Sequence, residues 1–167
     1  MSNLDYRLLR VPPDTLDEPI LEFIKNSDMQ DMGLPLPEFG WIACLNEEGY
    51  PIVGYVAGHR TYATRVFIDT FVVATQFRSR KLGSNLMYSF LKDMRTLGFS
   101  IVEGTLEPTN KEVYKYYDNL NIPYTPCHKL ELTLEDAILK LEDCTKNNQQ
   151  AKACVKKFPN TEKIEKK

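Results

Sequence analysis

The sequence predicts an α+β protein, that is, an α/β fold whose mixed, mainly antiparallel central sheet is flanked by helices. The chain has 167 residues, about the size of one domain, and 43% of them are hydrophobic, enough to fill a globular core. Runs of β-branched and aromatic residues are followed by segments in which apolar residues recur every three or four positions. This repeated change of period predicts strands and helices around a single core.

The first half of the chain is predicted to form a strand, a helix and two further strands. Residues 6–11 alternate as a strand does, and the proline pair that follows ends it. An apolar rhythm over residues 16–24 fits a helix, and residues 26–40 carry glycine and proline without a period, which indicates an irregular loop. Residues 41–45 and 52–57 are β-prone and flank a turn-rich segment, so we expect an antiparallel hairpin.

The second half of the chain begins with a strand at residues 66–74, expected at the centre of the sheet. Apolar residues then recur at helical spacing from Leu82 to Leu97, and Gly98 gives the helix a C-terminal stop. A strand at 99–106, a helix at 110–120 and a strand at 129–133 are expected to follow. The predicted order is therefore β-α-β-β-β-α-β-α-β. A helix at 134–141, with Thr133 as its cap, would extend it.

Several classes of protein are not expected from this sequence. It has neither a basic cap followed by a long apolar run at its start nor a stretch of about 18 apolar residues, so we expect a cytoplasmic protein that does not enter a membrane. Its four cysteines share no metal-ligand spacing, and the histidines, His59 and His128, lie beside predicted strands without a nearby ligand pair. The sequence therefore predicts no metal site and reduced, structural thiols.

Charge divides the chain into an acidic body and a basic end. Residues 145–167 carry seven Lys against two Glu, a net charge of +5, whereas the whole chain has −2 and the rest therefore −7. We expect one domain over residues 1–144 and a solvated tail over 145–167. Because the body is acidic and has no aromatic-basic stripe, nucleic acid is not the expected partner.

Residues 72–86 have the pattern expected of a phosphate-binding loop. They run from a buried strand through a basic loop into the start of the long helix. The first turn of a helix leaves backbone N–H groups unpaired and carries the positive end of the dipole, which favours a diphosphate. Arg78, Arg80 and Lys81 add positive charge, and Gly83 would allow close approach.

This segment resembles the motif of the GNAT family of N-acetyltransferases. The family pattern is an aliphatic residue, a linker, Arg or Gln, two variable residues, Gly, one variable residue, and Gly or Ala. Here it reads Val73 followed by Arg78-Ser-Arg-Lys-Leu-Gly83. The sequence departs from the family at Lys81, where glycine is usual, although a lysine in the helical backbone region could donate its ammonium to a phosphate.

A second resemblance lies downstream, over residues 110–120. The family has an Asn, two residues, a small apolar residue, and a Tyr four further on, which match Asn110, Val113 and Tyr117. The Gly-Phe that normally ends the helix is replaced by Asn121-Ile122, and Asn tolerates the left-handed cap conformation. The resemblance covers roughly residues 40–133.

The resemblance implies transfer of an acetyl or acyl group from acetyl-CoA to a primary amine by direct attack. In the family, a strand N–H before the loop polarises the thioester carbonyl, the Asn binds the cofactor arm, and the Tyr protonates the leaving thiolate. Tyr117 is accordingly the expected acid, with Tyr114 and Tyr116 as neighbouring alternatives or all of them as core residues. The expected cofactor-binding residues are Phe71, Val72, Val73, Arg78, Ser79, Arg80, Lys81, Leu82, Gly83, Ser84 and Asn110.

Asp69 is the candidate base for the acceptor amine. It precedes Phe71 and Val73 by two and four residues, so strand alternation predicts that all three share one face. Its carboxylate would act directly or through water, or it would serve as an ordinary hydrogen-bonded or substrate-binding Asp. Glu103 and Glu107 are alternative carboxylates.

The sequence leaves three functional interpretations. The first is an N-acyltransferase acting on an amine-bearing small molecule or protein. The second is an inactive acyl-CoA-binding or regulatory module of the same fold, favoured by Lys81. The third, a nucleic-acid-binding protein, would use the basic tail. The acceptor amine and a homodimer both stay open.

Overall fold

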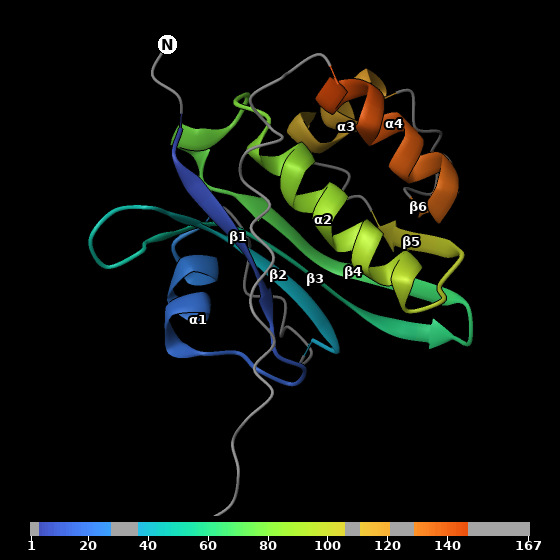
Figure 1. Cartoon of the computed structure of the whole chain (residues 1–167), viewed down its shortest axis with the longest axis horizontal. Coiled ribbons are helices and arrows are strands. Elements are labelled where there is room, and N and C mark those ends of the chain that lie inside the picture. The colour runs from blue at the N-terminus through green and yellow to red at the C-terminus, as the bar shows by residue number, and fades with distance from the viewer. Residues whose placement is uncertain (1–3, 28–36, 106–110, 121–128, 147–167) are drawn as a thin grey trace, which may run out of the picture.

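The computed structural model describes residues 4–27, 37–105, 111–120 and 129–146. A six-stranded sheet forms the centre of this part of the chain, with its strands in sequence order (Figure 1). Neighbouring strands are antiparallel except β4 and β5, which are parallel, so the predicted mixed and mainly antiparallel sheet is confirmed. The strands are β1 (Tyr6–Val11), β2 (Phe39–Leu45), β3 (Ile52–Tyr62), β4 (Arg65–Val73), β5 (Ile101–Thr105) and β6 (Lys129–Thr133).

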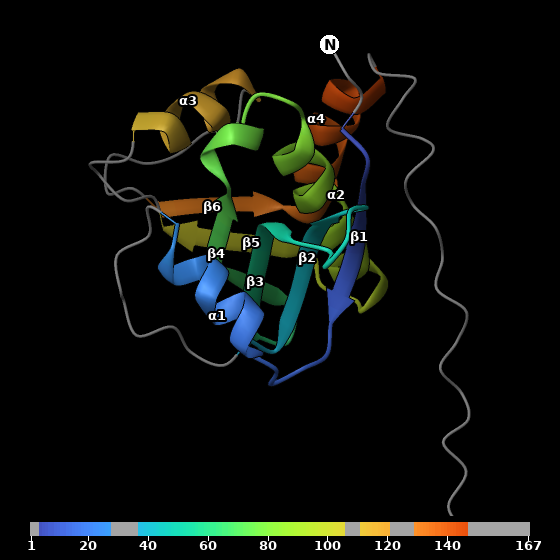
Figure 2. The same cartoon turned by 90° about the vertical axis from the view of Figure 1, so that its left-hand side faces the viewer.

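Helices cover both faces of the sheet. Helix α1 (Glu18–Lys25) lies on one face, which we call the α1 face, and the other helices lie on the opposite face, which we call the α2 face (Figure 2). These other helices are α2 (Leu82–Thr96), α3 (Lys111–Asn119) and α4 (Leu134–Lys146), and a short turn of 3-10 helix, η1 (Thr75–Phe77), precedes α2. The predicted order of elements is confirmed, and β4 is central as expected.

Several boundaries differ from the sequence prediction. Strand β2 begins at Phe39, inside the segment expected to be a loop up to residue 40, and β3 continues to Tyr62 instead of ending at 57. Helix α4 continues to Lys146, beyond its expected end at 141 and beyond the predicted domain end at 144. Tertiary pairing extends β2 and β3, because a strand beside a long partner continues as far as backbone hydrogen bonds are available.

Each face of the sheet has its own core cluster. On the α1 face, Ile20 and Ile24 of α1 pack with Tyr55 and Val72 of the sheet. On the α2 face, the buried residues of α2 and α4 pack against alternating strand residues, among them Val56 and Val66. Both clusters follow from the period of two in the strands and of 3.6 in the helices.

The ends of two helices follow the sequence signals. Past the end of α2, Gly98 has φ +90°, its N–H bonds the Arg95 carbonyl at 3.0 Å, and the Phe99 N–H bonds the Met94 carbonyl at 3.1 Å. This pair of bonds is a Schellman motif, in which glycine adopts the left-handed conformation without steric cost. At the start of α4, the Asp136 N–H donates to Thr133 Oγ1 at 3.1 Å, so the predicted cap is confirmed.

Hydrogen bonds also fix the position of α2 against the first two strands. Asp93 accepts from Trp41 Nε1 at 3.2 Å and pairs with Arg10 Nε at 3.1 Å. Near the other end of the helix, Asn85 Nδ2 donates to the Tyr6 hydroxyl at 2.6 Å. The N-terminus of α2 is thereby held in a defined place relative to the sheet.

A β-bulge interrupts the pairing of β3 with β4. Ala57 pairs with Thr70 and Gly58 with Ile68, so Asp69 is the additional residue on β4. Gly58 is required at this point, because a Cβ there would clash with the Phe67 carbonyl oxygen. The bulge changes the direction in which β4 side chains point on its two sides.

Strand β4 separates from β5 about halfway along its length. The parallel pairing joins residues 65–68 to 101–104, and among the described residues it ends with the pair Ile68 and Gly104. Beyond that point, β3 is the strand that pairs with residues 70–73 of β4 within the described part of the chain. We call this place, where Asp69 follows the last paired residue, the split.

Candidate active site

Backbone N–H groups of β4 point into the split. The Ala74 N–H donates to the Val53 carbonyl of β3 at 2.9 Å. Because N–H groups alternate in direction along a strand, those of Val73 and Phe71 point to the opposite edge, where the pairing with β5 has ended. This edge therefore presents two donors where the family resemblance expects the carbonyl to be polarised.

The first turn of α2 lies over the same edge. Its amides, those of Leu82, Gly83 and Ser84, precede the first helical bond, which runs from the Asn85 N–H to the Lys81 carbonyl at 3.0 Å. The cap residue Lys81 makes no side-chain capping bond. These amides and the helix dipole form a site suited to an anion, next to the free edge of β4.

Gly83 sits against β4. A Cβ on Gly83 would lie 3.3 Å from the ring of Phe71 and 3.3 Å from Val73 Cγ2. The sequence interpretation assigned this glycine to close approach of a ligand, whereas its geometry also serves close approach of helix and strand. A Cβ there would therefore require these side chains to shift by a few tenths of an ångström.

The basic loop is folded back onto the strand that precedes it. Arg78 Nε donates to the Val73 carbonyl oxygen at 3.0 Å, so its guanidinium lies at the end of β4. Arg80 and Ser79 are exposed, and Ser79 has φ +60°. Of the two arginines in this loop, Arg78 therefore also holds the loop closed, and Arg80 faces solvent.

Lys81 adopts the left-handed conformation, with φ 62° and ψ 2°. The expectation that it stays in the helical region is therefore wrong. Tertiary constraint explains the difference, because the chain must turn sharply between β4 and α2, and this is the position at which the family usually has glycine. For a residue with a Cβ, the left-handed region costs about 1–2 kcal/mol.

We predict that Lys81→Gly raises the free energy of unfolding by about 1 kcal/mol, because glycine removes the left-handed penalty. Thermal unfolding checks this, with an expected increase in Tm of about 2–4 °C. Arg80→Gly is the matched control: its φ is not positive, so it should lower Tm. A Lys81→Gly protein that melts lower than wild type would contradict the prediction.

Tyr117 reaches the split from the α2 face. Its side chain is 7% exposed and lines an apolar pocket with Ile68 of β4, Val102 of β5 and Tyr116. Burial raises the pKa of Tyr117 to about 12, so its hydroxyl stays protonated at neutral pH and remains a donor. The ring of Tyr116 contacts that of Phe71, with centroids 5.6 Å apart, so Tyr116 lies beside β4 as well.

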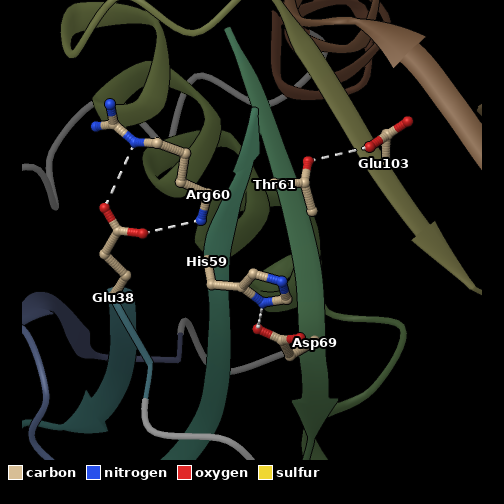
Figure 3. Close-up of polar contacts among 6 residues, drawn as sticks. All are labelled: Glu38, His59, Arg60, Thr61, Asp69 and Glu103. Carbon is tan, nitrogen blue, oxygen red and sulfur yellow. Dashed lines mark hydrogen bonds and ion pairs between the residues drawn. The ribbon is translucent and has the colours of Figure 1, made fainter. Parts of the chain in front are cut away.

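Asp69 lies at the split with its carboxylate bonded to His59, at 2.8 Å between Oδ2 and Nδ1 (Figure 3). Burial raises the pKa of the Asp69 carboxyl, and the bond and charge of His59 partly lower it. Asp69 also helps to raise the pKa of the buried Tyr55, which belongs to the α1-face cluster.

The expected shared face of Asp69, Phe71 and Val73 is wrong. Phe71 and Val73 pack on the α2 face, whereas Asp69 bonds His59, whose ring contacts Phe67. The bulge at Asp69 breaks the alternation on which the expectation depended. Asp69 and Tyr117 therefore approach the split from opposite sides.

The alternative carboxylate Glu103 is already engaged in an ion pair. It is buried on β5 and lies 2.6 Å from Arg65 Nη1. It also accepts a hydrogen bond from Thr61 Oγ1 at 3.3 Å (Figure 3). Asn110, Glu107, Asn121-Ile122 and the basic residues 147–167 lie outside the described residues. In the described part of the chain, no group of three or more His, Cys, Asp or Glu side chains could hold a metal ion.

Sequence reasoning missed His59. Its strand was expected to end at residue 57, and pairing it with Asp69 requires both the longer strand and the bulge. Gly58 was the available signal, because an isolated glycine within a strand often marks a bulge.

A comparison with protein-family models finds one match. The model described as the acetyltransferase (GNAT) family matches residues 7–121, more than half of the chain. The chain therefore belongs to the GNAT acetyltransferase family. No curated protein matches it.

Solved structures share the fold at low sequence identity. A Klebsiella pneumoniae protein assigned as an acyl-CoA N-acyltransferase has a TM-score of 0.63 at 15% identity, over 79% of this chain and 99% of that one. The Escherichia coli GNAT family N-acetyltransferase YhbS, solved with CoA, has a TM-score of 0.53 at 17% identity, over 83% of this chain and 88% of that one. A chain of the NatC complex, solved with a Gag peptide and CoA, has a TM-score of 0.54 at 18% identity, over 76% of this chain and 98% of that one. None of the described helices is long and apolar enough to cross a membrane.

Proposed function

We propose that this protein transfers an acetyl or related acyl group from acyl-CoA to a primary amine by direct attack. The observation that carries the proposal is the split between β4 and β5, which the N-terminus of α2 adjoins. Family membership and the CoA found in two structural neighbours support the acyl-CoA co-substrate.

The residues around the split supply the groups that the reaction needs. The first-turn amides of α2 and the loop arginines would hold the diphosphate of CoA. The Phe71 and Val73 amides would polarise the thioester carbonyl, since they point into the split. Asp69, or a group bonded to it, would remove the amine proton, and Tyr117 would be the acid that protonates the sulfur.

The acceptor is an amine-bearing small molecule or protein. The Asp69 carboxylate and the His59 imidazole bonded to it favour a neutral amine that loses one proton there as the new bond forms. Because Asp69 and Tyr117 lie on opposite sides of the split, the amine and the thioester would approach from different faces of the sheet.

Calorimetry with acetyl-CoA, followed by thiol release, tests the proposal. We expect acetyl-CoA to bind and to raise Tm by mass action, and at least one member of an amine panel to release CoA thiol. The panel comprises an N-terminal peptide, a lysine peptide, a polyamine and an arylamine. Absence of a Tm shift at millimolar acetyl-CoA would contradict the proposal.

Tight binding without thiol release from any amine would favour an inactive acyl-CoA-binding module instead. The left-handed Lys81 is the observation that favours this second function, since it stands where the family usually has glycine. The Lys81→Gly variant separates the two: if turnover appears only in that variant, the natural protein is the binding module.

A further inference from the structure

His59 and Asp69 are bonded to each other at the split, and their side chains differ in exposure to solvent. The imidazole of His59 is 39% exposed, whereas the Asp69 side chain is 12% exposed. Figure 3 shows the two side chains pointing toward each other from β3 and β4. A group arriving from solvent would therefore meet the imidazole before the carboxylate.

The hydrogen bond between them fixes the tautomer of a neutral imidazole. An ionised carboxylate only accepts, so Nδ1 must carry the hydrogen that it donates to Asp69 Oδ2, 2.8 Å away. Nε2 then carries the lone pair. In the described part of the chain, Nε2 makes no hydrogen bond, and the ring otherwise contacts Phe67 at 5.7 Å between centroids.

The charged groups around His59 are largely engaged with one another. On β5, Glu103 is paired with Arg65 of β4, and Thr61 of β3 donates to it. Beside β3, Glu38 accepts from the Arg60 backbone N–H at 2.9 Å and lies 3.6 Å from Arg60 Nε. Asp69 remains the carboxylate in direct contact with the imidazole, above the buried phenol of Tyr55.

We propose that His59 is the catalytic base that takes the proton from the acceptor amine, and that Asp69 is a positioning residue that orients it. The inference rests on the proposed acyl transfer. In this mechanism, the atom that accepts the amine proton is Nε2 of His59 and not an oxygen of Asp69. A nucleophile activated by an imidazole that a carboxylate orients is a general solution to this chemical problem.

The proposed step forms one C–N bond and breaks one C–S bond. The amine nitrogen forms a C–N bond with the acetyl carbonyl carbon, and the C–S bond breaks with its electron pair remaining on sulfur. The amine proton passes to His59 Nε2, which forms an imidazolium beside the Asp69 carboxylate, and the sulfur takes a proton from Tyr117. His59 then releases its proton to solvent and Tyr117 regains one, so the products are the N-acetyl amine and CoA thiol.

The tautomer can be measured without any substrate. The chain has two histidines, so ¹⁵N chemical shifts of the imidazole nitrogens, with His128→Gln for assignment, identify those of His59. We expect a protonated Nδ1 and a bare Nε2 for the neutral ring. Asp69→Asn should reverse this, because the asparagine NH₂ can donate to Nδ1. A bare Nδ1 in the wild-type protein would overturn the proposal.

Kinetics with acetyl-CoA and the best amine of the panel test the role itself. His59→Gln is expected to lower kcat about 10²-fold and to leave the Kd for acetyl-CoA within about twofold. Thr61→Val, on the same strand, is the matched control and should keep both the rate and the affinity. Asp69→Asn should lower kcat while retaining acetyl-CoA affinity.

The outcomes separate the inference from the function on which it rests. If wild-type protein acetylates an amine and His59→Gln keeps the rate, Asp69 or water is the base and only the inference fails. If acetyl-CoA binds but no amine is acetylated, or if acetyl-CoA does not bind, the proposed acyl transfer fails and the assignment of the base falls with it.

Discussion

Replacing Tyr117 by phenylalanine is expected to lower kcat about 10²-fold while the Kd for acetyl-CoA stays within about twofold. The substitution removes only the hydroxyl of a side chain that lines an apolar pocket together with Ile68, the last β4 residue paired with β5. With its pKa raised to about 12, Tyr117 carries its proton throughout the neutral range, and a donor at the sulfur assists departure of the thiolate. Stopped-flow or steady-state thiol release gives kcat, and calorimetry gives Kd.

Tyr116→Phe is the matched control for this prediction. Tyr116 is next in sequence, its hydroxyl is also buried, and its ring lies 5.3 Å from that of Tyr117. A large loss of rate in Tyr116→Phe with a normal rate in Tyr117→Phe would move the acid role to Tyr116. Equal and normal rates in both variants would assign protonation of the thiolate to solvent and leave Tyr117 as a core residue. Thermal unfolding of each variant checks that the core is intact.

Arg80→Glu is expected to weaken acetyl-CoA binding about tenfold at low salt. Arg80 is exposed beside the first turn of α2, where the diphosphate is proposed to lie, so reversal of its charge replaces attraction by repulsion. Screening should shrink the difference between variant and wild type as the ionic strength rises. Calorimetry at two salt concentrations measures both effects.

Lys92→Glu makes the same change of charge at a distant point of the same helix. Lys92 is exposed and lies over the ring of Tyr88, about 15 Å along the helix from Leu82. Its Kd should match that of wild type. If both substitutions weaken binding equally, overall charge is responsible and the loop is not the diphosphate site. Arg78 is less suited to this test, because it also bonds the Val73 carbonyl and its loss would disturb the loop.

The order of elements and the position of the basic loop were predictable from the sequence because both depend on local signals. Apolar spacing changes from two to 3.6 between residues 74 and 82, and Gly98 and Thr133 mark helix ends through their own backbone and side-chain chemistry. The start of α2 beside β4 follows from these signals. The family resemblance then added the expected roles of Arg78, Gly83 and Tyr117.

The tertiary structure decided how the candidate residues face one another. The bulge at Asp69 depends on the clash-free approach of Gly58 to the Phe67 carbonyl, a contact between two strands that alternation along one strand cannot predict. It turned Asp69 away from Phe71 and toward His59, a residue absent from the predicted site. The left-handed Lys81 likewise reflects the turn required between strand and helix. Local periodicity determines which elements form, whereas pairing register determines which side chains meet, because one additional residue reverses the face that follows.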